Sequence, residues 1–352
     1  MSRGKLTVLV GGQYGSEGKG KIAAHVADKY NVAVRVGSYN AGHTFYWHGD
    51  KHVMQAIPCG WINPNATIVI GRGAIEPIEG LLSEIEHIEK YYPDFKKRLV
   101  IDANAGVLEN KYHEAEGGKD GWFNAKIGST GEGCGAARIA RMQRDPSNFH
   151  RISEIADSIG LGECIMEDTP RLIADMQDAG ENVLIEGTQG SGLSLLHSNW
   201  PYCTSIDTNA AGVISEVGIA PTRVTDVLMV VRTYPIRVAG NSGPMKNEVT
   251  WDYLSEALNK EITPEKTTVT HKVRRIAQWD KDLFRNACLL NAPTEIALTF
   301  ADYIDPDIYD SDNVLKVLGS EKLRKFIKDS GIAEGGHLKY IGTGANGIVE
   351  VQ

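Results

Sequence analysis

Residues 6–21 read LTVLVGGQYGSEGKGK, and this stretch decides the fold. Residues 6–10 form an apolar run typical of a buried strand, two glycines end it, and a helical pattern begins near Gly18. A strand that passes through glycines into a helix is the setting in which backbone N–H groups and the helix dipole hold phosphate. Residues 15–21 are close to a Walker A loop, but Ile22 stands where that loop has Ser or Thr for Mg²⁺. We therefore predict a phosphate loop of another lineage; the alternative is a glycine-rich turn with two exposed lysines.

The rest of the chain repeats this order of strand and helix. Residues 75–91 carry Ile and Leu at helical spacing and predict a helix. Because strands alternate with helices, we expect an α/β protein with a mainly parallel central sheet and helices on both faces. Ligands bind to such sheets beyond the carboxyl ends of the strands. Further strands are predicted at residues 32–36, 68–70, 99–101, 183–185 and 227–231.

The composition excludes several classes of protein. Hydrophobic residues make up 42% and charged residues 23%, which is typical of a globular protein, and the net charge of −8 argues against broad nucleic-acid binding. Five scattered cysteines without a CxxC pair argue against a disulfide framework or zinc site and indicate a reducing compartment. No apolar run approaches the ~18 residues of a membrane span, and we expect no signal peptide. These features predict a cytoplasmic enzyme that binds neither nucleic acid nor membrane.

The domain organisation is expected to be simple. We predict one domain over residues 1–352 with small loop subdomains. Residues 241–272 are richer in Asn, Thr, Lys and Pro, and we expect them to form an excursion that carries a mobile substrate loop.

Small polar residues gather in three more glycine-rich loops. Each loop alone is typical of a turn, but together they predict a pocket for more than one substrate. The loops are residues 40–44 (NAGHT), 127–133 (IGSTGEG) and 186–190 (EGTQG), the last continued by 201–204 (PYCT).

Two segments carry side chains with distinct chemistry. His43, beside Gly42 at a predicted strand end, is either a structural histidine or a group that polarises or protonates a substrate oxygen. Residues 267–275 (TTVTHKVRR) join hydroxyls to basic side chains, and Arg presents a two-pronged fork to a carboxylate. The segment is therefore either a binding loop for a carboxylate substrate or a solvated, basic helix start.

The ordered set GSEGKGKI, NAGHT, IGSTGEG, EGTQG, PYCTS and TVTHKVRR resembles adenylosuccinate synthetase in its short form, from Val8 to about Gly347. Members of that family transfer a phosphoryl group to the 6-oxo group of a purine nucleotide and then let the amine of aspartate displace phosphate. The resemblance implies a C–N ligase with Mg²⁺ as cofactor. It also implies a homodimer with a shared active site.

Ser16 is the first departure from the family's pattern. The family has Asp at this position, which takes the N1 proton of IMP and binds Mg²⁺. A phage branch of the family, which serves 2-aminoadenine (diaminopurine) DNA, is similar to this chain and carries Ser there; its substrate is dGMP. The resemblance therefore implies succinylation of dGMP to N6-succino-2-amino-2′-deoxyadenylate, with the Ser16 hydroxyl accepting a hydrogen bond from the 2-amino group.

Other departures concern the donor and aspartate. Phe300-Ala301-Asp302 stands where the family reads the guanine of GTP with Lys-x-Asp, which favours ATP or dATP as donor. Lys272 and Val273 stand where the family has arginines, and Glu132 replaces a basic residue. The alternatives are an ordinary adenylosuccinate synthetase that uses IMP and GTP, and a nucleotide sensor without activity.

The resemblance assigns site residues by position. Catalysis is expected to involve Ser16, Lys19 and His43. The donor is expected to contact Gly15, Ser16, Glu17, Gly18, Lys19, Gly20, Lys21, Gly42, His43, Thr44, Asp302, Gly342, Thr343 and Gly344. The residues expected to bind dGMP are Ser16, Asn40, Ser129, Thr130, Arg144, Gln189, Thr204 and Val238. L-aspartate is expected to contact Val269, Thr270, Lys272 and Arg274, and Mg²⁺ is expected to contact Ser16 and the Gly42 carbonyl. Arg144 is preferred over Arg138 and Arg141 as the arginine that reaches the phosphate from a second subunit.

Overall fold

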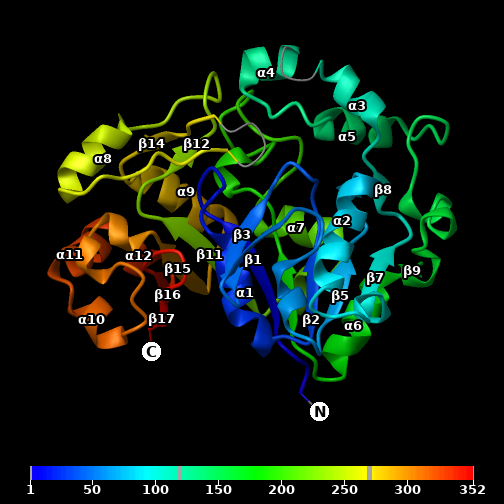
Figure 1. The fold of residues 1–352 in the computed structure, drawn as a ribbon, viewed down its shortest axis with the longest axis horizontal. Coiled ribbons are helices and arrows are strands. Elements are labelled where there is room, and N and C mark those ends of the chain that lie inside the picture. Colours follow the sequence, from blue (N-terminus) through cyan, green and yellow to red (C-terminus); the bar gives the residue numbers. More distant parts are fainter. Residues whose placement is uncertain (1, 118–120, 268–271, 352) are drawn as a thin grey trace.

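The computed structural model describes residues 2–117, 121–267 and 272–351 (Figure 1). Within these ranges ten strands form one sheet, in the order β17-β16-β15-β11-β1-β10-β2-β5-β7-β9. Every neighbouring pair is parallel except β16 and β17, which confirms the predicted mainly parallel sheet. In chain order the strands are β1 Leu6–Gly11, β2 Val32–Arg35, β5 Thr67–Ile70, β7 Leu99–Asp102, β9 Ile165–Met166, β10 Val183–Glu186, β11 Asp226–Arg232, β15 Glu295–Thr299, β16 His337–Gly342 and β17 Ile348–Glu350.

Helices cover both faces of the sheet because its strands are apolar on both faces. In β1, Leu9 packs into one core, whereas Leu6, Val8 and Val10 pack into the other, and all four are buried. A parallel sheet covered on both faces requires such continuous apolar strands. The first core takes residues from α1 Lys19–Val26 and α2 Ile78–Glu89; the second takes residues from α6 Thr169–Asp178, α7 Ala210–Val217 and α9 Lys281–Asn291.

Smaller elements surround the carboxyl ends of the central strands. Figure 1 shows α3, α4 and α5 together on one side of this end and α8 with β12 and β14 on the other. None of the helices in the described ranges is long and apolar enough to cross a membrane. The remaining helices are α3 Asn110–Ala115, α4 Trp122–Ile127, α5 Cys134–Gln143, α8 Trp251–Leu258, α10 Val314–Gly319, α11 Glu321–Ser330 and α12 Ile332–Gly335. The small sheets pair β3 His43–Trp47 with β4 Asp50–Met54, β6 Ile75–Glu76 with β8 Gly106–Val107, and β12 Ile236–Arg237 with β14 Arg275–Ala277 and β13 Glu248–Val249.

The predicted elements are confirmed with two differences. The prediction of a helix from residue 75 is wrong at its start, because Pro77 occupies the N-cap in extended conformation and the helix begins at Ile78. The two residues before Pro77 pair as β6 with β8. The predicted excursion over residues 241–272 contains β13 and α8, and β13 joins the small sheet, so that part of the segment is folded onto its neighbours. Residues 268–271 lie outside the described residues.

A buried carboxylate attaches the chain after the β3–β4 hairpin to α2. Glu84 accepts hydrogen bonds from the backbone N–H groups of Gln55 (2.6 Å), Ala56 (3.2 Å) and Ile57 (2.9 Å). Burial raises the pKa of Glu84, while these backbone bonds act in the opposite direction. Because β3 carries His43 at its first residue, this attachment also fixes the strand that enters the candidate site.

Replacing Glu84 should therefore destabilise the fold. In Glu84→Ala three backbone N–H groups lose their acceptor, and we expect the free energy of unfolding to fall by about 3 kcal/mol. Glu86 lies on the same helix but is exposed, so Glu86→Ala should change it by less than about 0.5 kcal/mol. Denaturant unfolding of both variants measures the difference. Equal midpoints and slopes for the two would contradict the structural role of Glu84.

Candidate active site

The four glycine-rich loops converge on one cavity of about 1060 Å³ at the carboxyl ends of the central strands. This is the position at which parallel sheets bind ligands. Predicted site residues that border the cavity are Gly15, Ser16, Gly18, Lys19, Gly20, Lys21, Asn40, Gly42, His43, Thr44, Ser129, Thr130, Gln189, Thr204, Val238, Arg274, Asp302 and Gly344. The structure thus brings together most of the residues that the sequence singled out.

The phosphate loop is organised around the carboxylate of Glu17. This fully buried group accepts the N–H groups of Gln13 (3.1 Å) and Gly15 (2.8 Å) and the ammonium of Lys19 (2.7 Å). The side chain of Glu17 therefore holds the loop from inside and does not border the cavity. Gly18, in the left-handed conformation that glycine tolerates, caps α1 without a side-chain bond. The first N–H groups of the helix are left for an anionic ligand.

Two lysines lie at this end of the cavity. Besides Glu17, the Lys19 ammonium donates to the carbonyl of Gln189. Lys21 donates to the carbonyls of Gly344 and Gly347, each at 2.7 Å, and burial lowers the pKa of Lys21 to about 8. Together with the open helix N-terminus, the two ammonium groups make this region suited to the phosphates of a nucleotide.

His43 belongs to a buried triad with Glu186 and Arg35. Glu186 and Arg35 are register partners at the carboxyl ends of β10 and β2. One Glu186 oxygen lies 2.5 Å from His43 Nδ1 and 2.8 Å from an Arg35 nitrogen, and the other accepts the N–H of Cys59 at 2.7 Å. The ionised Glu186 carboxylate can only accept hydrogen bonds, so His43 must donate to it from Nδ1. The ring proton therefore resides on Nδ1, and Nε2 carries the lone pair.

The triad keeps His43 neutral before ligands bind. Burial, together with the nearby Arg35 charge, lowers the pKa of His43 to about 4, although Glu186 acts in the opposite direction. Burial alone would raise the pKa of Glu186, but His43 and Arg35 hold it below the usual value. Nε2 is buried and has no partner in the described part of the chain. A phosphoryl group beside Nε2 would have to raise the pKa of His43 before the ring could donate a proton.

Metal binding is tested by the donor groups. Ligand atoms of His43, Cys59 and Glu186 lie within 4.8 Å of one another, but the Arg35 guanidinium contacts both His43 and Glu186. That cation already neutralises the carboxylate, so the group does not fit a metal. Ser16 and Gly42 border the cavity and offer a hydroxyl and a carbonyl oxygen. These fit Mg²⁺, which prefers oxygen ligands and commonly takes several of them from substrate phosphates.

Of the residues expected to bind the nucleoside monophosphate, Asn40 follows β2 and Gln189 follows β10, the two strands that carry Arg35 and Glu186. Gln189 donates to Asn40 at 3.3 Å, and its amide oxygen is buried without a partner in the described residues. Ser129, Thr130, Thr204 and Val238 border the same cavity.

The three candidate arginines of residues 138–144 differ in their contacts. Arg138 forms an ion pair with Glu216 at 2.6 Å. Arg141 donates to the carbonyls of Arg72 and Asn104. Arg144 is exposed at the end of α5, and its guanidinium makes no hydrogen bond or ion pair with the described residues. Of the three, Arg138 borders the cavity, whereas Arg144 is exposed and its own chain does not place it there.

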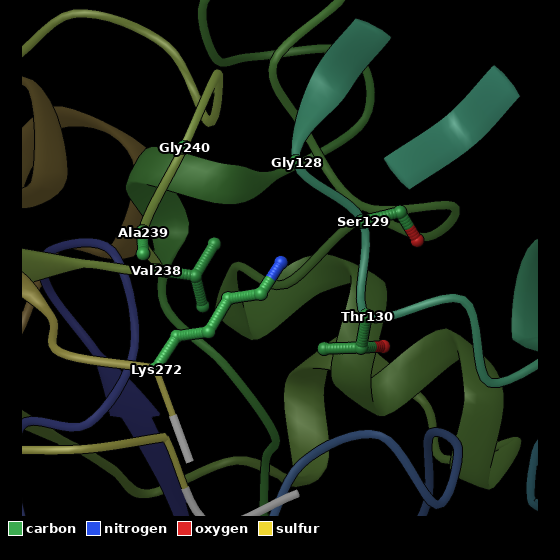
Figure 2. Close-up of a pocket in the computed structure, with 7 residues that line it drawn as sticks. All are labelled: Gly128, Ser129, Thr130, Val238, Ala239, Gly240 and Lys272. Atoms are coloured by element: carbon green, nitrogen blue, oxygen red, sulfur yellow. The ribbon is translucent and has the colours of Figure 1, made fainter. Parts of the chain in front are cut away.

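The predicted aspartate-binding residues are divided between two places. Arg274 borders the main cavity, where burial lowers its pKa. Lys272 instead lines a neighbouring cavity of about 40 Å³ together with Gly128, Ser129, Thr130, Val238, Ala239 and Gly240. Figure 2 shows its side chain extending past Val238 toward the loop of Ser129 and Thr130. Lys272 thus faces the nucleotide loop, while Val269 and Thr270 lie outside the described residues.

Asp302 and Gly344 border the cavity near Lys21. Burial raises the pKa of Asp302 to about 6, against the effect of its own backbone and of Lys21, and one carboxylate oxygen has no partner among the described residues. Gly342 and Thr343 do not border the cavity; the Thr343 hydroxyl donates to the Ser311 carbonyl. These two residues support the loop from behind.

The sequence did not single out four charged residues that organise the site. Arg35 and Arg232 end apolar strands, and Glu186 was quoted only as part of a loop, so their positions at strand ends were the available signal. Glu265 had no local signal, because its partner Arg232 is distant in the sequence.

Comparisons with known proteins agree with this geometry. The family model described as adenylosuccinate synthetase matches residues 8–159 and 146–308. Adenylosuccinate synthetases from Methanococcus maripaludis and Methanocaldococcus jannaschii are 37% and 38% identical; each alignment covers 96% of this chain, and 96% and 94% of the relatives.

Solved structures show the same fold. Cyanophage S-2L succinoaminodeoxyadenylate synthetase (PurZ), bound to dGMP and to dATP as an energy donor, superposes with a TM-score of 0.81 at 27% identity, covering 99% of this chain and 95% of that one. Plasmodium falciparum adenylosuccinate synthetase superposes with a TM-score of 0.83 at 20% identity, covering 99% and 100%, and this shows the fold alone. Sequence and fold together establish that the chain belongs to the adenylosuccinate synthetase family of C–N ligases.

Proposed function

We propose that this chain joins L-aspartate to C6 of dGMP, with ATP or dATP as phosphate donor, to give N6-succino-2-amino-2′-deoxyadenylate. The observation that carries the proposal is Ser16, which stands where the family's pattern has Asp and borders the cavity with its side chain exposed. A serine leaves room for a 2-amino group, and its oxygen accepts a hydrogen bond from it. The PurZ structure, whose bound nucleotides are dGMP and dATP, supports the same assignment.

The residues at the cavity would divide the reaction as follows. The N-terminus of α1, Lys19 and Lys21 would bind the donor phosphates and stabilise charge as the γ-phosphoryl group moves to O6. His43 would contact O6 through Nε2, and the phosphorylated state would raise its pKa so that it can protonate the departing phosphate. Mg²⁺, when bound by Ser16, the Gly42 carbonyl and the donor, would neutralise phosphate charge. Arg274 would bind a carboxylate of aspartate.

The second candidate is an adenylosuccinate synthetase that acts on IMP with GTP. It is favoured by the 37% identity to curated enzymes of that name over nearly the whole chain. Ser16 argues against it, because the family's pattern for IMP has Asp at this position. The N1 proton itself does not separate the two candidates, since IMP and dGMP both carry one. Asp302 also lacks the lysine that the family pairs with it for guanine, because Phe300 stands there.

Product mass separates the two candidates directly. The purified protein is incubated with aspartate, Mg²⁺ and ATP or GTP, and dGMP and IMP are offered in parallel. We expect a succinylated product from dGMP and little from IMP. Product from IMP alone would reject the proposal in favour of the second candidate. If neither monophosphate gives product or releases phosphate, the chain has lost ligase activity.

Ser16→Asp tests the structural basis of the purine preference. The longer carboxylate would fill the space expected for the 2-amino group, and we expect kcat/KM for dGMP to fall by about tenfold or more. Ser16→Ala removes the hydroxyl without adding bulk and should change kcat/KM for dGMP by only a few-fold. If Ser16→Asp turns over dGMP as well as the wild type does, the role of Ser16 in purine selection is wrong.

A shared active site would explain the position of Arg144. It follows α5, on which Ile139 and Met142 are exposed (52% and 77%), and Trp200 nearby at the cavity rim is 75% exposed. Exposed apolar side chains beside an unpaired arginine are typical of a surface that a second copy covers.

Subunit complementation tests this arrangement. Arg144→Ala and His43→Asn should each lower activity strongly. When the two variants are mixed under conditions that exchange subunits, the heterodimer contains one intact site, so activity should return to about a quarter of the wild-type value. No recovery from a verified heterodimer would show that Arg144 does not act across the interface.

A further inference from the structure

Arg232 is a fully buried cation that no step of the proposed reaction uses. Arg232 is the last residue of β11. The side-chain amide of Gln13 accepts a hydrogen bond from the backbone N–H of Arg232 (2.9 Å) and donates one to its carbonyl (3.0 Å). The base of this side chain is therefore fixed against the strand end.

The guanidinium of Arg232 contacts three different walls of the cavity. One nitrogen donates to the Ser16 carbonyl at 3.0 Å and to a Glu265 oxygen at 3.2 Å, and the second nitrogen donates to the other Glu265 oxygen. Its Cζ atom lies over the ring of Phe300, 3.7 Å from the ring centroid. Ser16, Glu265 and Phe300 all border the cavity. One side chain thus joins the phosphate loop, the segment before β14 and the end of β15.

The phosphate loop needs such an attachment at this point. Ser16 is in the left-handed region with φ 57°, which is unfavourable for a residue with a Cβ. Its carbonyl is held by Arg232, and the neighbouring Gly15 N–H is held by Glu17. With both sides of the residue bonded, the loop keeps the curvature that leaves its N–H groups open at the start of α1.

We infer that Arg232 is a positioning residue for the phosphate donor, and that Phe300 and Glu265 keep it in place. The carboxylate fork compensates the buried charge, and the aromatic ring supports the planar face of the guanidinium. Phe300 has a role here that a lysine cannot fill, because a second cation would lie against the buried guanidinium. The inference rests on the proposed function only in that a nucleoside triphosphate binds at the phosphate loop, and it holds for ATP, dATP or GTP.

Arg232→Lys tests the inference because it keeps the positive charge and removes the planar guanidinium with its several N–H donors. We expect KM for the triphosphate to rise by about tenfold or more, with KM for the monophosphate changed by less than about threefold. The affinity for inorganic tripolyphosphate with Mg²⁺, measured by calorimetry, should fall to the same extent. This measurement reports on the phosphate loop without turnover. The assay uses whichever monophosphate the wild type accepts, so failure of the dGMP assignment is seen in the wild type and leaves this comparison intact.

Arg98→Lys is the matched control. Arg98 likewise donates to backbone carbonyls, at Asn63, Trp61 and Ala66, and lies over two aromatic rings, but it does not border the cavity. Its substitution should lower Tm without changing the affinity for tripolyphosphate. If Arg232→Lys does the same, Arg232 is a stabilising residue and the inference is wrong.

Phe300 variants keep the inference testable if Arg232→Lys does not fold. Phe300→Leu retains an apolar support and should weaken tripolyphosphate binding by only a few-fold, whereas Phe300→Lys should weaken it as much as Arg232→Lys would. Glu265→Gln should have an intermediate effect, since it retains one acceptor. Unchanged tripolyphosphate affinity in a folded Phe300→Lys variant would overturn the inference.

Discussion

The ion pair of Glu17 with Lys19 is the interaction on which the candidate site depends. Both side chains are buried, and removal of either partner of such a pair leaves an uncompensated charge at a cost of about 3–5 kcal/mol. The Glu17 carboxylate needs space at the carboxyl ends of the central strands. A Cβ at Gly11 would lie 2.5 Å from one Glu17 oxygen, and a Cβ at Gly190 would lie closer still to the other. Glycines from β1 and from the loop after β10 are thus required by the same anion.

Local patterns explain why much of this architecture was predictable. The apolar run, the glycines and the helical spacing of residues 6–22 are all within one short stretch, and the carboxyl-end rule then predicts where the other loops meet. The ordered motifs identified the family. The start of α2 was misplaced because apolar spacing continues across Pro77, although the ring of that proline disfavours helical conformation in the residue before it. Contacts such as His43 with Glu186, or Arg232 with Glu265, join residues far apart in sequence, and no spacing encodes them.

The charge of the cavity could not be inferred from the whole chain either. The net charge is −8, yet Lys19, Lys21 and Arg274 all border the cavity, while Glu17 and Glu186 hold their carboxylates behind it. Eight Lys and Arg and five Asp and Glu border the cavity, so its lining is positive although the whole chain is negative. His43 stays neutral beside a carboxylate because burial lowers its pKa and because the Arg35 guanidinium, which shares that carboxylate, opposes protonation of the ring.

Two of the departures from the family's pattern, Ser16 and Phe300, contact the same side chain. They lie 284 positions apart by number, 16 and 300, but the Ser16 carbonyl and the Phe300 ring both contact the guanidinium of Arg232. A change of the Phe300 ring acts on this guanidinium directly, whereas a change of the Ser16 side chain acts on it only where it moves the backbone of the loop. If Ser16 selects the purine and Phe300 alters the donor end, the two preferences are not independent. The Phe300 ring supports the same guanidinium that holds the Ser16 carbonyl, so a replacement of Phe300 acts on the conformation of the phosphate loop through Arg232.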